Sequence, residues 1–351
     1  MNVRTAQRTV QLFWVVVGTA AISALLWRGA ILLAALVAVP LLFGQAFWLA
    51  LQFWLAASSA KRRDAAGDVS PPAPSRAAWL RAWWVEVWMC TRSYGWHQPW
   101  SPVSADGFEA AGAAGATRSG ARTAPSRGIL LVHGYMCSGG FWQPWLRQLR
   151  TLGRPHVAVS LQPALADIDS YAPQIEAAWQ RLVTATGAPP LIVSHSMGSV
   201  VVRAWLRWRL SARPGGTFDG AVPHDIISLG SPHHGTWLAR FGRGRAAAQM
   251  NEDSPWLTEL EQFESDHDLA GLANWVCVYS DCDNMVFPPR NGCLPGSHEV
   301  FLPGLAHMEL AFDPRVIELA LWMADEVAGS TASGLTLPAA LDAALTRPAA
   351  L

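Results

Sequence analysis

The stretch Leu191-Ile-Val-Ser-His-Ser-Met-Gly-Ser199 decides the fold of this chain. It begins as an apolar run of strand length, passes through a serine between small residues, and continues as a helical pattern over 199–210. In the G-x-S-x-G form of such a turn the serine stands above the end of the strand, because small neighbours let the backbone turn sharply. Ser194 replaces the first glycine here. We expect the turn at Ser196 to form nevertheless, with some added backbone strain.

Short apolar runs alternate with helical patterns on both sides of this stretch. The runs of strand length are 128–133, 156–161, 191–193, 225–229 and 275–279, and the helical patterns are 171–186 and 199–210. Strands that are apolar throughout are typical of sheets covered by helices on both faces. The sequence therefore predicts an α/β fold, with a mostly parallel sheet flanked by helices.

Candidate chemical groups follow two of the predicted strands. Ser196 is the candidate nucleophile, and the run 130–132 ends in His133-Gly134, where the backbone can supply hydrogen-bond donors. The tetrahedral intermediate of acyl transfer needs two preorganised N–H groups for its oxyanion, and we assign these to Tyr135 and Met197. We expect His133 to support this loop instead of acting as a catalyst.

An acid and a base follow the candidate nucleophile along the chain. His307 is the candidate base for Ser196, and Asp283 is the candidate acid that sets the tautomer of the imidazole. The chain order Ser, Asp, His is that of α/β-hydrolases. Asp281 is an alternative acid, because it follows the same predicted strand. The competing histidines are His233, His234 and His298, the last of which lies in a Gly-Ser-rich loop.

These motifs together resemble those of bacterial triacylglycerol lipases and GPI-inositol-deacylase-like esterases of the α/β-hydrolase superfamily. The resemblance covers about 128–325 and rests on LLVHGY, SHSMGS, LGSPHHGT, QMNEDSPWL and GLAHMEL. It implies an α/β-hydrolase domain at 128–330, with a short cap at about 237–270 over a Ser196-His307-Asp283 triad. The calcium-binding acids of such lipases cannot be matched here, and we assign no metal and no cofactor.

The first 63 residues differ in charge from the rest of the chain. They hold six of the 26 basic side chains and none of the 26 acidic ones. The uncharged runs 9–27 and 29–60 are long enough to cross the hydrocarbon core of a bilayer, which is about 30 Å thick. We therefore predict a transmembrane hairpin within 1–60, with spans at about 9–27 and 30–57, and not a cleaved signal peptide or a buried helical pair.

Basic residues flank the predicted hairpin on both sides. Arg4 and Arg8 precede the first span and Lys61-Arg62-Arg63 follows the second, so we expect both ends in the cytoplasm of a bacterium, with the catalytic domain at the inner membrane. Residues 61–127 are expected to hold a linker at 67–74, a Trp-rich amphipathic helix at 76–89 and a flexible loop at 105–127. That helix either packs on the domain or lies in the membrane interface. A C-terminal tail occupies 331–351.

The remaining composition excludes several classes of protein. No basic stripe follows residue 63, which disfavours nucleic-acid binding. The five cysteines include no C-x-x-C pair, so we expect buried thiols, with a Cys282–Cys293 disulfide only in an oxidising compartment. The oligomeric state stays open. Resemblance and anchor together imply a membrane-anchored serine esterase or lipase acting on lipid-like esters; the alternatives are an acyltransferase, a thioesterase, a polyester depolymerase, or a catalytically silent membrane scaffold.

Overall fold

The computed structural model describes residues 2–65, 71, 73–100, 127–211, 225–268 and 273–325. Most of the predicted linker at 67–74, nearly all of the predicted loop at 105–127 and the whole tail at 331–351 lie outside these residues.

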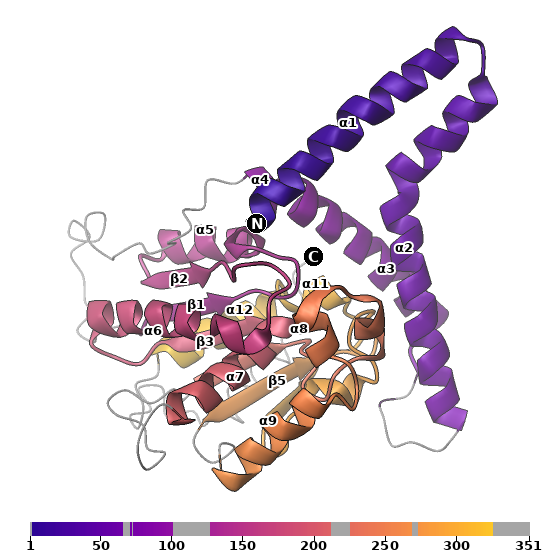
Figure 1. The fold of residues 1–351 in the computed structure, drawn as a ribbon. Helices are drawn as coiled ribbons and strands as arrows, with labels where there is room; N and C mark the ends of the chain where they lie inside the picture. The colour runs from indigo at the N-terminus through magenta and orange to yellow at the C-terminus, as the bar shows by residue number, and fades with distance from the viewer. Residues whose placement is uncertain are drawn as a thin grey trace.

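Within these residues, six parallel strands form one sheet in the order β2-β1-β3-β4-β5-β6 (Figure 1). The strands are β1 (Ile129–Val132), β2 (His156–Val159), β3 (Leu191–His195), β4 (Asp225–Leu229), β5 (Asn274–Tyr279) and β6 (His298–Phe301). β3 lies inside the sheet, where Val193 is in register with Leu131 of β1 and Ile227 of β4. The prediction of a parallel sheet is confirmed, with strand ends that differ by one or two residues.

The edge strand β6 contradicts the assignment of His298 to a loop. This strand pairs in parallel with β5, with His298 in register with Val276. Its side chains alternate in burial, since Val300 is buried while Glu299 is exposed. An edge strand packs only one of its faces, so its sequence needs few apolar residues. The backbone pairing with β5, and not an apolar run, made this segment a strand.

Helices cover both faces of the sheet (Figure 1). One face packs on α5 (Gln143–Thr151) and α12 (Pro314–Asp325), and the other packs on α6 (Ala172–Thr186) and α7 (Met197–Ser211). Alternate strand residues serve the two faces: Leu131 and Val193 belong to the first core, and Leu130 and Ile192 to the second. This architecture, with a helix starting directly after the serine at the end of β3, is the α/β-hydrolase fold.

Two long apolar helices, α1 (Val3–Trp27) and α2 (Ile31–Ala65), form a hairpin that projects from the α/β body (Figure 1). By length and composition both could cross a membrane, with mean hydropathies of 1.9 and 2.1 and only 6% of each window buried. α3 (Arg76–Arg92) runs beside α2 at the base of the hairpin. The short α4 (Gln98–Trp100) follows it and contacts α1.

The base of the hairpin is bound to the rest of the molecule. In α1, Arg8 Nε donates to the carbonyl of Pro99 over 2.6 Å. In α2, Leu49 and Phe53 are each only 5% exposed. The predicted second span, 30–57, therefore belongs to a longer helix whose second half packs on the α/β domain.

Candidate active site

The backbone turns sharply at Ser196, between β3 and α7. Ser196 has a φ of 57°, a backbone conformation that residues other than glycine rarely adopt. Its N–H donates to the carbonyl of Leu229 over 2.9 Å, which ties the turn to the end of β4. A Cβ at Gly198 would lie 2.6 Å from the carbonyl oxygen of Val132, so glycine is required there. The turn therefore has the geometry expected of a nucleophile elbow.

Ser194 occupies the position where the pattern has glycine, and its side chain is fully buried. Its Oγ lies 2.8 Å from Ser199 Oγ and donates to the carbonyl of Ile227 over 3.2 Å. The extra hydroxyl is thus accommodated under the turn and hydrogen-bonded there. The departure from the pattern does not prevent the turn.

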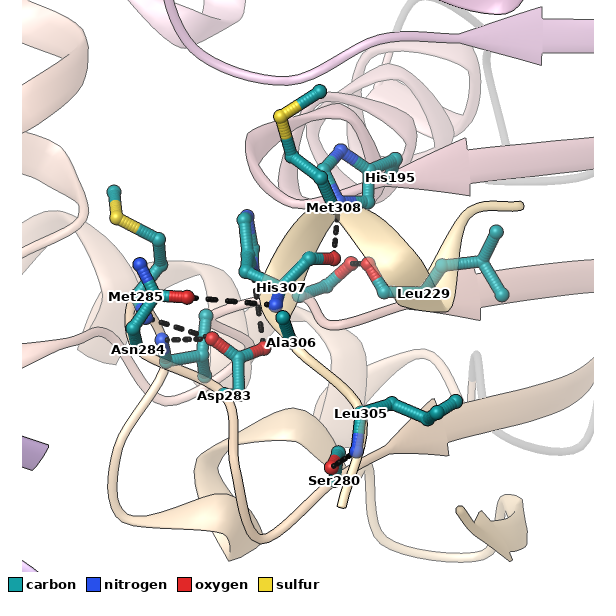
Figure 2. Close-up of polar contacts among 12 residues, drawn as sticks. His195, Leu229, Ser280, Asp283, Asn284, Met285, Leu305, Ala306, His307 and Met308 are labelled. Atoms are coloured by element: carbon teal, nitrogen blue, oxygen red, sulfur yellow. Dashed lines mark hydrogen bonds and ion pairs between the residues drawn. The ribbon is translucent and has the colours of Figure 1, made fainter. Parts of the chain in front are cut away.

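Asp283 and His307 form a buried hydrogen-bonded pair beside the turn (Figure 2). His307 Nδ1 donates to Asp283 Oδ2 over 2.9 Å. The other oxygen, Asp283 Oδ1, accepts from the backbone N–H groups of Met285 and Val286 at 2.7 and 2.8 Å, which fixes the orientation of the carboxylate. Gly230 has a φ of 51°, and a Cβ there would lie 2.9 Å from Asp283 Oδ2. The absence of a side chain at Gly230 lets the end of β4 approach the pair.

Ser196, His307 and Tyr135 line one cavity of about 300 Å³. A second cavity, of about 220 Å³, shares Ser196 and Tyr135 with the first, and its other wall includes Leu238 and Met250. Met197 is the first residue of α7, and N–H groups in the first turn of a helix have no acceptor within the helix. Of the two residues whose N–H groups we assigned to an oxyanion, Met197 directly follows Ser196 in the chain and Tyr135 lines both cavities with it.

The segment expected to form a cap divides into two parts. Residues Trp237–Phe241 and α8 (Gly244–Gln249) contribute to the wall of the second cavity. α9 (Pro255–Asp266) packs against α7 instead, and its residues line neither cavity at Ser196.

The competing residues lie elsewhere. Asp281 Oδ1 accepts from the N–H of Gly304 over 2.7 Å and does not contact the imidazole of His307. His233 Nε2 lies 2.7 Å from Ser228 Oγ, and His234 Nδ1 lies 2.8 Å from a carboxylate oxygen of Glu261. None of these residues lines either cavity at Ser196.

His133 connects the ends of β1 and β2. Its Nε2 accepts from the N–H of Leu161 over 3.0 Å, so its Nδ1 carries the proton and donates to the carbonyl of Gly134 over 2.8 Å. Burial lowers the pKa of His133 to about 4, which keeps the ring neutral. These contacts suit the supporting role that we expected for this residue.

Two buried residues of the site were missed by the sequence analysis. His195 Nε2 donates to the carbonyl of His307 over 3.1 Å (Figure 2). The ring of His195 stacks on Phe141 at a centroid distance of 4.8 Å. Glu86 is 2% exposed, comes from α3, and lines the cavity with Ser196. Its Oε2 accepts from the N–H of Met308 over 3.0 Å. A single acid within an apolar, Trp-rich helix was the available signal for Glu86.

The negative charges around His307 and its burial have opposite effects on the pKa of its imidazole. Burial of the imidazole lowers its pKa and is the largest contribution, but the charge and hydrogen bond of Asp283, with the charge of Glu86, outweigh it and leave the pKa raised. Burial also raises the pKa of Glu86 to about 7. The charge of Glu86 therefore acts on the imidazole of His307 in addition to that of Asp283.

Glu86→Gln is expected to shift the acidic limb of the pH profile of kcat/KM to lower pH. A general base must be neutral, and removal of the Glu86 charge lowers the pKa of His307, so the variant stays active at more acidic pH. Glutamine can still accept the hydrogen bond from Met308. The measurement is ester hydrolysis across pH, with Glu309→Gln as the control because Glu309 pairs with Arg81 and does not line the cavity. If the acidic limb of the kcat/KM profile were unchanged in Glu86→Gln, the charge of Glu86 would not act on the pKa of His307.

Comparisons with known proteins give distant similarities of fold. No family model and no curated protein matches the chain. A Bacillus licheniformis lipase in its mature form is similar, with 16% identity and a TM-score of 0.45 over 53% of this chain and 86% of that one. Lipase B of Aspergillus fumigatus has 16% identity and a TM-score of 0.48 over 62% of this chain and 56% of its own. Assignment of an activity must therefore rest on the site.

Proposed function

We propose that this protein is a membrane-anchored serine hydrolase that cleaves carboxylic esters of lipid-like substrates through an acyl-enzyme. One observation carries the proposal: Ser196, raised by its left-handed turn, lines the same cavity as His307, whose Nδ1 is held by Asp283 at 2.9 Å. A serine and an imidazole that line one cavity, with a carboxylate that orients the imidazole, are the groups that nucleophilic acyl transfer requires.

The reaction follows from the positions of these groups. Ser196 Oγ attacks the ester carbonyl while His307 Nε2 takes the hydroxyl proton, and the backbone N–H groups of Tyr135 and Met197 stabilise the oxyanion. Collapse of the intermediate breaks the bond to the alcohol, which leaves with the proton from His307. Water then attacks the acyl-enzyme with His307 as the base again, and the acid is released while Ser196 regains its proton.

The two cavities that meet at Ser196 favour an ester with two sizeable parts. Their shared wall is formed by Trp48, Gln52, Tyr135, Ser196 and Met285. An acyl group and an alcohol on opposite sides of one carbonyl can therefore occupy separate cavities while the carbonyl lies at Ser196. The apolar hairpin supports a lipid-like substrate, because it holds the catalytic domain close to lipid.

Two assays on the purified full-length protein test this function. A fluorophosphonate probe should label Ser196, since it reacts with activated serines. p-Nitrophenyl esters of increasing acyl length should then be hydrolysed, with the best kcat/KM at medium or long chains. A protein that neither reacts with the probe nor cleaves any of these esters would be inconsistent with an esterase.

We also expect the N- and C-termini to lie on the cytoplasmic side. The basic residues on both flanks of the hairpin favour that side, and a hairpin returns the chain to the side from which it entered. A reporter fused after residue 351 should give green fluorescence and no alkaline-phosphatase activity. The protein should remain with membranes through a high-salt wash, because apolar insertion is not screened. Active phosphatase would place the catalytic domain in the periplasm.

A further inference from the structure

The N-terminal hairpin contributes a wall of the catalytic cavity. Four residues at i, i+3, i+4 and i+7 of α2 line the cavity that contains Ser196: Gln45, Trp48, Leu49 and Gln52. We propose that this face of α2 is the acyl-chain subsite, and that a long-chain ester enters it sideways from the bilayer past Trp48. This inference rests on the esterase function proposed above. It assigns to a helix outside the hydrolase domain a part in substrate selection.

The wall extends from the surface of the molecule to the reactive serine. Trp48 is 51% exposed although it lines both cavities at Ser196, so the cavities reach the surface along α2. Leu49, the next residue, and Gln52, one turn further along the helix, are each 5% exposed and form the inner part of the wall. An extended chain lying on α2 would therefore pass from an exposed apolar surface to the buried site.

α3, which packs beside α2, also carries an exposed apolar face. Leu80, Trp84 and Trp88 lie on one face of α3 at intervals of four residues and are 65, 66 and 58% exposed. The opposite face, which includes Ala82 and Glu86, is buried against the domain. Tryptophan is enriched where a bilayer meets water, so the exposed face of α3 suits the membrane interface. The sequence left open whether this helix packs on the domain or lies in the membrane interface. We infer that one face of α3 does the first and the opposite face the second.

The length of the hairpin brings this opening to the level of the lipid. Beyond its contacts with the domain, α1 extends over 12–27 and α2 over 31–44, which correspond to about 24 and 21 Å at 1.5 Å per residue. Both lengths are shorter than a hydrocarbon core of about 30 Å. Insertion of the hairpin up to its base therefore brings Gln45 and Trp48 to the interface, whether or not the tip reaches the far side.

Hydrogen bonds hold α2 in position relative to the catalytic pair. Asn284 Nδ2 donates to Gln52 Oε1 over 2.9 Å, and Asn284 follows Asp283 directly in the chain. Trp83 Nε1 of α3 donates to the carbonyl of Ala46 in α2 over 3.0 Å. A chain held on α2 therefore presents its ester carbonyl at a defined distance from Ser196.

Sideways entry has a physical advantage for a long acyl chain. The transfer of each methylene group from lipid into water costs free energy, whereas a chain that passes from lipid to the apolar face of α2 stays out of water. A short acyl chain gains little from this route because it dissolves in water. The subsite should therefore matter for long esters and not for short ones.

Two esters with the same leaving group test the inference on full-length protein in phosphatidylcholine vesicles. p-Nitrophenyl palmitate is supplied within the bilayer and p-nitrophenyl acetate in the water. Trp48→Ala, which removes part of the wall, and Gln45→Trp, which narrows the opening, should each lower kcat/KM for the palmitate about tenfold more than for the acetate. Trp54→Ala is the matched control: Trp54 lies on the same helix, is 63% exposed and lines neither cavity at Ser196. It should leave both rates near those of the wild type.

The outcomes separate this inference from the esterase function. Equal losses with palmitate in Trp48→Ala and Trp54→Ala would reduce α2 to an anchor and overturn the inference, as would unchanged palmitate rates in both cavity variants. Equal losses with palmitate and acetate would mean that the variants damage the catalytic site itself, which also overturns it. A wild-type protein that cleaves acetate but not palmitate keeps the esterase function and refutes the acyl subsite. A wild type that cleaves neither ester refutes the esterase function.

Discussion

Ser196→Ala should abolish ester hydrolysis, with a fall in kcat on the order of 10⁶-fold, and should abolish labelling by a fluorophosphonate. Without the hydroxyl no acyl-enzyme can form, and only the residual contribution of substrate binding and the oxyanion donors remains. The fold should persist, because the backbone N–H of Ser196, and not its side chain, bonds to the carbonyl of Leu229. Thermal unfolding followed by circular dichroism would verify this.

Ser194→Ala provides the matched control for that experiment. Ser194 lies two residues away, is fully buried, and lines neither cavity at Ser196. Its loss breaks hydrogen bonds to Ser199 and Ile227 and should lower stability by about 1 kcal/mol per bond without preventing labelling. Labelling that persists in Ser196→Ala would show that another residue is the nucleophile.

Asp283→Asn should lower kcat/KM about 10⁴-fold, whereas Asp281→Asn should change it only a few-fold. The amide can present its NH₂ to Nδ1 of His307, which then favours the tautomer with the proton on Nε2, where it cannot accept the proton of Ser196. The fold should survive, because the amide oxygen can still accept from the N–H groups of Met285 and Val286.

The comparison with Asp281→Asn is informative because the two acids lie two residues apart in one loop. Asp281 bonds to the N–H of Gly304, a contact that an amide oxygen can also make. Initial rates with a short soluble ester measure both variants without a contribution from lipid binding. If Asp281→Asn were the more damaging change, the role of the acid would move to Asp281 and the assigned geometry would be wrong.

Local patterns were sufficient for strands β1 to β5 of the sheet and for the turn after β3. The apolar runs at 129–132 and 191–193 are buried on both faces, and a sequence without polar alternation is the direct consequence of such burial. The edge strand β6 carries His298 and Glu299 and lacks that signature, because an edge strand is solvated on one side. It therefore could not be distinguished from a loop.

The sequence by itself determined the parallel sheet, the apolar hairpin and the serine turn, since each depends on the spacing of residues that are neighbours along the chain. Only the tertiary structure decided which acid meets His307, because Asp281 and Asp283 lie two residues apart in one loop. Asp283 contacts the imidazole of His307, whereas Asp281 accepts from the backbone N–H of Gly304. The tertiary structure also decided that Glu86 of α3 and Trp48 of α2 belong to the site. Both residues are more than a hundred positions away from Ser196 in the chain, and helix packing brings them to it. A pattern among neighbouring residues contains no information about such contacts.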